Sequence, residues 1–319
     1  MGCEVENPVR AGARWVTRWA RHVRVDGRGV EDVARRIRDL PVPPWEGRYH
    51  FQGEEELTLR YLLALDALNF CFWPPSGSSG GKWAVPGPDG ERLTGYFALA
   101  YALRRRAEGD PSSLEPRALA DATVGWVRAI LGEVPLLPWR ARALREVGAA
   151  LLRFGSAREF FACAQGSCLR LVELVTSHLP LFRDSALYRG REVVFHKRAQ
   201  ILCADLWGTF GGEGPGALHD LDWLTAFADY KLPQLLWAQG GLVLHPTLAG
   251  RLKRGEELRP GSPEEVELRA ATIMAVEELT AALRAGGRGV RAFEVDWILW
   301  NLSQGPLSVP HPRVRTFFY

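Results

Sequence analysis

The chain contains few lysines, and its charges of opposite sign almost cancel. Its 40 basic and 37 acidic residues leave a net charge of +3, so no overall field attracts long nucleic acid. We therefore expect no stable nucleic-acid complex, although a local basic pocket for one phosphate stays open. Because most of the cations are arginines, each lysine departs from the composition of the chain; the lysines are Lys82, Lys197, Lys231 and Lys253.

Cysteine and histidine patterns typical of disulfides or metal sites are missing. The five cysteines are odd in number, scattered and without a Cys-x-x-Cys pair, which favours reduced core thiols. No His-Glu-x-x-His occurs and the seven histidines are dispersed, so we predict no metal site. The glycines before Lys82 superficially resemble a phosphate-binding loop, but the Walker spacing and the following Ser or Thr are lacking.

Long hydrophobic runs are also missing. No run approaches about 18 uncharged apolar residues, the length needed for a membrane-spanning helix. The segment before Pro41 is rich in arginine and has no apolar stretch long enough for a signal peptide. We expect a soluble, cytoplasmic protein without membrane contact.

Helical periodicity dominates what is present. With 47% hydrophobic residues the chain can bury a large core, and strand-like alternation is scarce. We predict an all-α fold of about ten helices with a few short strands. Since neither a long linker nor an internal repeat is present, one compact domain over residues 1–319 is expected. The apolar spacing predicts helices over 15–25, 30–40, 57–70, 96–103, 119–131, 143–154, 169–179, 199–210, 221–230, 266–283 and 293–302, and extended pieces at 49–52, 82–85, 91–93 and 192–195.

Glycine-rich segments mark two further features. The stretch from Pro74 to Gly81 has the composition of a flexible surface loop, either a plain hairpin connection or a lid. Gly240 and Gly241 follow one helical run and precede another that opens at Pro246, which predicts a helix, a tight turn and a second helix. That arrangement resembles the helix-hairpin-helix of base-excision DNA glycosylases.

The most informative single residue is Asp229, which lies in the apolar stretch from Leu224 to Leu235. A carboxylate among groups that exclude water either pairs with a cation or performs chemistry, because an unpaired buried charge is too costly to keep. We therefore predict a catalytic role for Asp229.

Two upstream segments carry further candidates. Lys197 and Arg198 are adjacent cations at the start of a helical run, and their alternative role is to cover that helix start. Near the end of another helix, Asp66 is followed by an amide and aromatic cluster, and its alternative role is to cap the helix or to pair with Arg60. We interpret His196 and Asp205 as structural residues, joined to their surroundings by an ion pair or a hydrogen bond. The cluster after Asp66 consists of Asn69, Phe70, Phe72 and Trp73.

The C-terminal part adds another set. Asp296 and Trp300 are four residues apart and so share a helical face, where the indole has a carboxylate beside it. The segment from Pro310 to Tyr319 is too aromatic and basic for a frayed tail, and we expect it to dock onto the body. Arg313 and Arg315 are candidates for holding a phosphate, with solvent exposure as the alternative.

These segments together resemble the queuosine salvage protein family. The resemblance extends from about Tyr49 to the C-terminus, and its Phe-Ala-Asp-Tyr block is specific. The glycine and serine residues from Ser76 to Gly81 belong to none of its motifs. The motifs are Asp66-x-Leu68-Asn69-Phe70-x-Phe72-Trp73, Thr94-Gly95-Tyr96, Phe195-x-Lys197-Arg198-Ala199-Gln200-Ile201-Leu202, Phe227-Ala228-Asp229-Tyr230-x-Leu232-Pro233-Gln234 and the terminal Tyr319.

The resemblance implies a nucleotide N-glycosylase that needs no cofactor and releases queuine from queuosine 5'-monophosphate for salvage into tRNA. It implies that Asp229 is the catalytic aspartate and Lys197 the active-site lysine. A carboxylate beside the sugar stabilises the oxocarbenium-like transition state and orients or deprotonates the attacking water. Covalent capture by the same carboxylate is the alternative. We expect a monomer whose partner is this small-molecule substrate.

Queuine is a 7-deazapurine, so the ring position that ordinary purines protonate on departure is carbon. We therefore expect hydrogen bonds and stacking at the base, and a carboxylate, Asp66 or Asp296, facing its cationic aminomethyl arm. Lys197, with Arg198, would neutralise the 5'-phosphate or hold Asp229 as an anion. The other predicted substrate contacts are Asn69, Phe70, Trp73, Trp300, Arg315 and Tyr319.

Two alternative functions stay open at this point. One is a non-catalytic module that binds tRNA or a nucleotide through the same aromatic residues. The other is a DNA-base glycosylase, which the two helices around Gly240 and Gly241 suggest. The chain lacks the surplus of cations that duplex binding demands.

Overall fold

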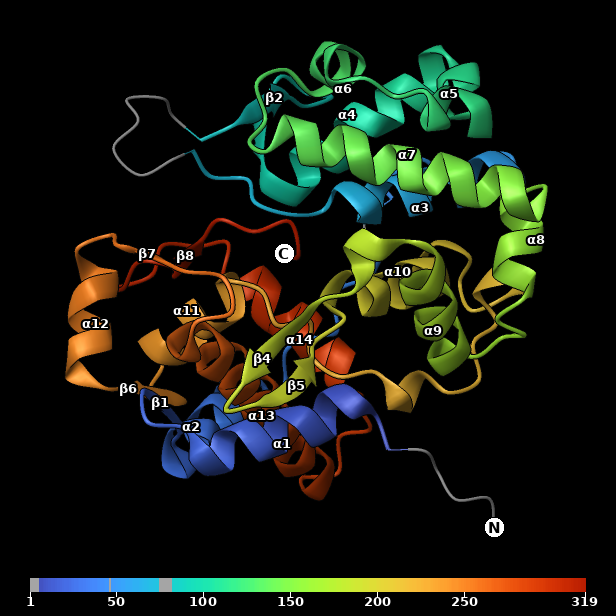
Figure 1. Cartoon of the computed structure of the whole chain (residues 1–319). Helices are drawn as coiled ribbons and strands as arrows, with labels where there is room; N and C mark the ends of the chain where they lie inside the picture. Colours follow the sequence, from blue (N-terminus) through green and yellow to red (C-terminus); the bar gives the residue numbers. More distant parts are fainter. Residues whose placement is uncertain (1–5, 46, 75–81) are drawn as a thin grey trace. The chain divides into compact units, whose positions relative to one another are not determined.

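The computed structural model describes residues 6–45, 47–74 and 82–319. Within these ranges the chain forms fourteen α-helices, four 3-10 helices and eight short strands, which confirms the predicted all-α class (Figure 1). Every sheet in the described part has only two strands. No described helix is both long and apolar enough to cross a membrane. The predicted loop at Ser76–Gly81 lies outside the described residues.

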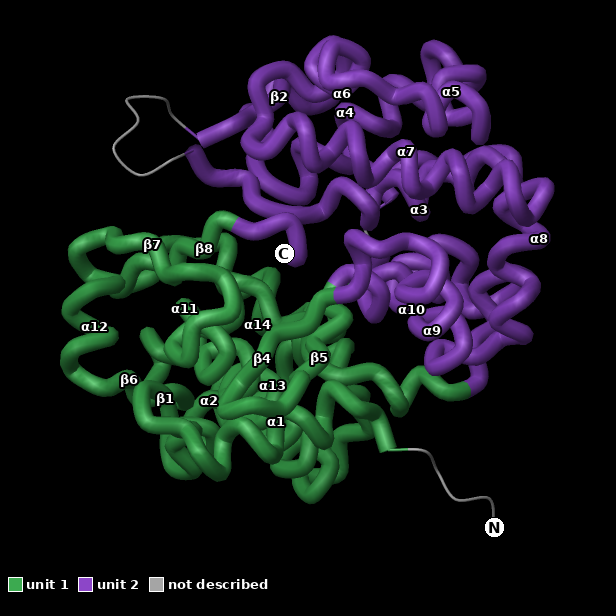
Figure 2. The backbone as a smooth tube through the Cα atoms, in the orientation of Figure 1, with its two compact units in different colours: residues 1–44, 184–197, 220–315 green, residues 45–183, 198–219, 316–319 purple. Residues whose placement is uncertain are grey.

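The backbone divides into two compact units, each assembled from segments that are distant in sequence (Figure 2). Unit 1 comprises residues 1–44, 184–197 and 220–315, and unit 2 comprises residues 45–183, 198–219 and 316–319. The expectation of a single domain over residues 1–319 stays a prediction. Because the boundaries interleave, neither unit corresponds to one continuous stretch of sequence.

Unit 1 is built around one long helix. Helix α13 is buried on most of its length, and buried residues of α1 and of the β4–β5 hairpin form an apolar core with it. Ala228, the residue before Asp229, belongs to this core. The elements are α1 (Pro8–Trp19), β1 (Val23–Val25), α2 (Gly27–Ile37), β4 (Ser185–Tyr188), β5 (Arg191–Val194), η4 (Leu221–Trp223), α11 (Lys231–Ala238), β6 (Leu242–Leu244), α12 (Pro246–Lys253), β7 (Glu257–Leu258), α13 (Pro263–Ala285), α14 (Ala292–Leu302) and β8 (Arg313–Val314).

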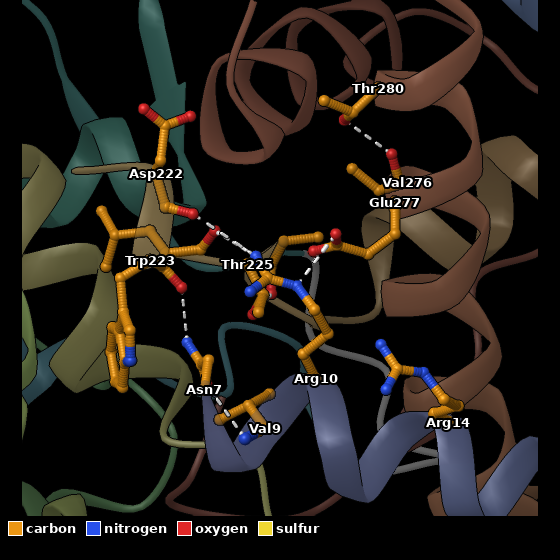
Figure 3. A network of polar contacts seen from close by, with 12 residues as sticks. Asn7, Val9, Arg10, Arg14, Asp222, Trp223, Thr225, Val276, Glu277 and Thr280 are labelled. Carbon is orange, nitrogen blue, oxygen red and sulfur yellow. Dashed lines mark hydrogen bonds and ion pairs between the residues drawn. The ribbon is translucent and has the colours of Figure 1, made fainter. Parts of the chain in front are cut away.

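A polar network at the start of α1 holds the segment that leads toward Asp229 (Figure 3). The Asn7 side chain caps α1 by accepting the Val9 N–H at 2.8 Å, and its Nδ2 donates to the Trp223 carbonyl at 2.7 Å. Arg10 forms an ion pair with Glu277 of α13 at 2.9 Å. The first helix is thereby joined to both the η4 segment and the central helix.

Unit 2 is a helical body in which α3 is buried on all sides from Leu57 to Leu68. A close approach also brings α7 against α5, since a Cβ built on Gly148 would lie 2.1 Å from the Ala120 nitrogen. The elements are α3 (Glu55–Leu68), β2 (Ala84–Pro86), β3 (Arg92–Thr94), α4 (Gly95–Gly109), η1 (Pro111–Leu114), α5 (Pro116–Ala120), α6 (Val124–Leu131), α7 (Leu137–Phe154), α8 (Ala157–Ala162), α9 (Cys168–His178), η2 (Pro180–Phe182), α10 (Lys197–Thr209), whose first residue falls in unit 1, and η3 (Gly214–Gly216).

Five local predictions are wrong. The predicted helix over 119–131 is interrupted, since α5 ends at Ala120 and α6 begins at Val124. The helix, tight turn and second helix predicted around Gly240 and Gly241 have the strand β6 between α11 and α12. Residues 49–52 form a turn and coil instead of a strand. The predicted helix over 15–25 ends at Trp19 and is followed by β1, which pairs with β6. The predicted helix over 221–230 is only the short η4, after which the chain runs without regular structure until α11 begins. Side chains distant in sequence hold this last segment, as described below.

Candidate active site

The segment before Asp229 lacks regular structure, and side chains from two helices bind its backbone. Asp296 of α14 accepts the Phe227 N–H at 2.8 Å through Oδ2. Arg269 of α13 donates from Nε to the Ala228 carbonyl at 3.2 Å. Buried backbone N–H and C=O groups need hydrogen-bond partners, and these two side chains supply the partners that a helix would otherwise provide. They fix the position of the backbone that carries Asp229.

Asp229 lies at the amino end of α11, where one of its oxygens meets the free N–H groups of the helix. Oδ1 accepts the Lys231 N–H at 2.7 Å and the Leu232 N–H at 3.0 Å. Oδ2 accepts no hydrogen bond from the described residues, and 9% of the residue is exposed. The carboxyl group is therefore held by one oxygen and has the other available for a reacting group.

Lys197 is the first residue of α10 and is almost fully buried. It follows His196, whose φ of 46° is the left-handed conformation that makes the turn from β5 into the helix. The Lys197 N–H donates to Asp184 Oδ2 at 3.1 Å. The catalytic role of Lys197 and its alternative role, covering the start of this helix, both stay predictions.

Burial raises the pKa of Asp229, while the nearby positive charge of Lys197 and the two backbone N–H groups lower it. Burial also raises the pKa of Asp296 well above its ordinary value, and the negative charge of Asp229 raises it further. Only the Phe227 N–H and Lys197 oppose that rise. On balance the pKa of Asp229 is raised, and that of Asp296 is raised well above its ordinary value, so Asp296 is the more readily protonated of the two carboxyl groups.

The raised pKa of Asp296 bears on its predicted role. A carboxyl group that takes up a proton offers no negative charge to a cationic aminomethyl arm, so a raised pKa is unfavourable for that contact. Trp300 lies one helical turn further along α14 and is half-buried. Arg315 forms an ion pair with Glu257 of β7 at 3.2 Å. The substrate contacts predicted for these three residues stay predictions.

In unit 2, the predicted base-binding cluster is a buried, irregular segment directly after α3. Asn69 is the C-cap of the helix, and Cys71 has a φ of 42°. Arg140 of α7 holds this segment by donating to the carbonyl groups of Leu68, Phe70 and Cys71, the last at 3.0 Å. Its guanidinium also lies over the Phe70 ring at 4.4 Å. The backbone of the cluster is therefore rigidly supported.

Arg198 has a similar anchoring function at the end of α3. Its Nη1 donates to the Asp66 and Ala67 carbonyl groups at 3.1 and 2.6 Å, and its Nη2 donates to Leu181. The alternative pairing of Asp66 with Arg60 is not formed, because Arg60 pairs with Glu56 and Glu115. The substrate roles of Arg198 and Asp66 stay predictions.

The C-terminal segment docks onto the body, as predicted. The Tyr319 carbonyl accepts the Cys71 N–H at 3.0 Å, and Tyr319 is buried. Phe317 stacks on Trp139 of α7 with a centroid distance of 4.4 Å. Both contacts lie within unit 2. The first joins the C-terminal segment to the stretch that follows α3, and the second joins it to α7.

The sequence reading missed several buried polar residues. Tyr96, which belongs to the motif Thr94-Gly95-Tyr96, donates to Asp205 at 2.7 Å, and this confirms the predicted hydrogen bond of Asp205. Tyr96 also contacts His50 at 2.9 Å, and His50 belongs to none of the motifs. The Nδ1 atom of His196 is buried and has no hydrogen-bond partner within the described residues, so the predicted pairing is not seen at that atom. Arg140, Arg269 and Asp184 gave no sequence signal, since isolated charges usually indicate solvent-facing positions.

The described residues contain no group of three or more His, Cys, Asp and Glu side chains that could hold a metal ion. The family described as Queuosine salvage protein matches residues 49–319 of the chain. The chain belongs to the queuosine salvage protein family. Its match includes Lys197, Asp229 and Asp296 as well as the cluster after α3.

Relatives in this family align over nearly the whole chain. A protein of Sphaerobacter thermophilus is 44% identical over 315 residues, which cover 96% of either chain. A Dictyostelium discoideum protein is 33% identical, with 98% of both chains covered, and a Mus musculus protein is 33% identical, with 97% of this chain and 98% of its own covered. Each carries the name queuosine 5'-phosphate N-glycosylase/hydrolase.

Proposed function

We propose that this chain is a hydrolase that cleaves the C–N glycosidic bond of queuosine 5'-phosphate and releases queuine. The names of its full-length relatives in the queuosine salvage protein family support this activity. The observation that carries the proposal is a buried carboxylate, Asp229, with one oxygen bound by a helix N-terminus and the other available.

The geometry of Asp229 suits glycosidic cleavage. As the base departs, positive charge develops on the sugar ring, and a fixed anion in a water-poor site stabilises that charge strongly. The two N–H bonds to Oδ1 prevent the carboxylate from rotating, so the stabilisation requires no reorganisation during the reaction. The same group is placed to orient the attacking water or to capture the sugar covalently.

Lys197 supports the reaction through its charge. It favours the anionic form of Asp229, whose pKa burial alone would raise further. Contact with the 5'-phosphate is its second proposed role, since an ammonium group is a compact partner for phosphate. The base contacts predicted for Asn69, Phe70 and Trp73, and the expected monomeric state, remain part of the proposal.

The test is release of free base from queuosine 5'-monophosphate, followed by chromatography and mass detection. We expect Asp229→Asn to lower kcat by about a thousandfold while substrate affinity changes little, because the lost interaction forms mainly in the transition state. The control is Asp222→Asn, a mostly exposed aspartate of the same segment that pairs with Arg284 at 2.6 Å, and it should retain turnover.

Two results would contradict the proposal. Wild-type protein that binds the nucleotide and never releases base would indicate a binding module instead of an enzyme. An Asp229→Asn variant with undiminished kcat would show that another group performs the chemistry.

A further inference from the structure

Unit 1 contains a buried ion pair between Arg269 and Asp184, next to the segments that carry Asp229 and Lys197. Arg269 of α13 donates from Nη1 to Asp184 Oδ1 at 2.7 Å and from Nη2 to Asp184 Oδ2 at 2.6 Å. Both residues are almost completely buried. The two parallel bonds form a fork that fixes the relative orientation of guanidinium and carboxylate.

The pair binds the backbone of both segments that carry the proposed catalytic groups. The third donor of Arg269, Nε, reaches the carbonyl of Ala228, the residue before Asp229. Asp184 Oδ2 accepts the N–H of Lys197. One ion pair therefore connects two stretches that are about thirty residues apart in sequence, counting from Lys197 to Asp229.

The surroundings of Arg269 leave it little freedom. Its guanidinium lies 4.0 Å from the centroid of the Phe195 ring, and Glu265 lies one helical turn before it with an Nη1–Oε1 distance of 3.7 Å. The Asp184 carbonyl also accepts the Phe195 N–H at 2.8 Å. Both members of the ion pair are thus held in place by contacts with neighbouring residues.

We propose that the Asp184–Arg269 pair positions the active site by setting the separation of Asp229 and Lys197, without touching the substrate. The inference rests on the proposed function. Catalytic groups displaced by about 1 Å lose on the order of a hundredfold in rate, so a rigid link between the two has a direct kinetic effect. A buried ion pair adds little net stability, so stability alone gives a weak reason for its presence.

The donor geometry accounts for arginine at position 269. Three donors directed to two separate acceptors, the Asp184 carboxylate and the Ala228 carbonyl, require a planar guanidinium. A lysine has one nitrogen and cannot reach both acceptors in the same geometry. Arg269→Lys therefore keeps the charge and removes the connection.

The experiment measures kcat and KM for base release by wild type, Arg269→Lys and Asp184→Asn, with urea unfolding of each. We expect kcat to fall about 10- to 100-fold in Arg269→Lys and KM to change less than about threefold, because ground-state binding does not need this alignment. Asp184→Asn keeps an acceptor oxygen and should show a smaller loss. It also serves as the test if Arg269→Lys does not fold.

The matched control is Glu267→Gln, two residues away on α13. Glu267 is equally buried, and it accepts the N–H groups of Arg21, His22 and Val23 and the Tyr188 hydroxyl instead of binding either catalytic segment. We expect a lower urea midpoint in this variant with kcat within about twofold of wild type. Loss of stability and loss of turnover are thereby separated.

A double-mutant cycle adds a readout that a purely structural role would not change. If Asp184 acts through Lys197, Asp184→Asn should cost much less in kcat when Lys197→Ala is already present. In the Lys197→Ala background, Glu267→Gln should change kcat by the same factor as in wild type, so that the effects of the two substitutions multiply. A folded Arg269→Lys variant with wild-type kcat, or multiplied effects for Asp184 and Lys197, would overturn the positioning role while leaving the proposed function intact. A wild type without base release would overturn both.

Discussion

Asp296→Asn tests the raised pKa that makes Asp296 the more readily protonated of the two buried carboxyl groups. Asp296 is buried, and its pKa is raised well above the ordinary value by burial and by the charge of Asp229. Between the unfolded and the folded pKa of Asp296, the folded state therefore holds a proton that the unfolded state has released. An asparagine has nearly the same shape, can accept the Phe227 N–H through Oδ1 and never ionises.

The sign follows from proton linkage. A carboxyl group with a raised folded pKa contributes stability that is fully present below its unfolded pKa, about 4, and is lost as the pH rises to the folded value. Within that window each pH unit costs wild type about 1.4 kcal/mol relative to the variant. Asp296→Asn should therefore match wild type near pH 4 and exceed it by about 1.4 kcal/mol more for each pH unit above that, until the pH reaches the folded pKa of Asp296.

The assay is urea unfolding of both proteins at half-unit steps from pH 4 to pH 8. Asp26→Asn provides a control without pH dependence in this range, because the Gly29 N–H and Arg24 lower the pKa of Asp26. Its stabilising contribution is lost only as the pH falls below about 4, so the difference between this variant and wild type should stay constant from pH 4 to pH 8. Parallel stability curves for wild type and Asp296→Asn across the whole range would refute a proton held at Asp296.

Three further outcomes are expected. Lys197→Ala should weaken binding of the nucleoside monophosphate much more than binding of the free nucleoside, and equal losses on both substrates would exclude the phosphate role. In the same variant the acid limb of the kcat/KM profile should move to higher pH, because Lys197 lowers the pKa of Asp229. Gly148→Ala should cost more than about 2 kcal/mol in urea unfolding, since its Cβ would meet the Ala120 backbone; a neutral effect would contradict the close approach of α5 and α7. Arg140→Met should cost about 3 kcal/mol or more by leaving three buried carbonyl groups without a donor, and calorimetry checks this.

The sequence predicted most helices because their apolar spacing reflects the buried face directly. It failed at residues 221–230 for a physical reason. Leu221, Leu224 and Ala228 are buried and have helical spacing, yet an irregular chain buries them equally well once Asp296 and Arg269 satisfy its backbone. Periodicity records which residues are buried, and it does not record how the backbone between them is hydrogen-bonded.

In the candidate site, too, the sequence predicted some features and missed others. Asp229 was identifiable because a lone carboxylate in an apolar stretch is rare, and the family motifs indicated Lys197. The partners that fix them were not identifiable, since Asp184 and Arg269 are 85 residues apart and each looks like an ordinary surface charge in the sequence. Only the folded chain shows that these charges are paired inside the protein.

Three of the buried cations that the structure describes are arginines: Arg140, Arg198 and Arg269 are each almost fully enclosed. A guanidinium keeps its proton at any pH that a protein survives, whereas an enclosed ammonium group readily gives its proton up. Alkaline conditions therefore leave these internal supports fully charged. A change of pH therefore acts on the groups that these arginines hold in place, whereas the charge of the arginines themselves stays constant.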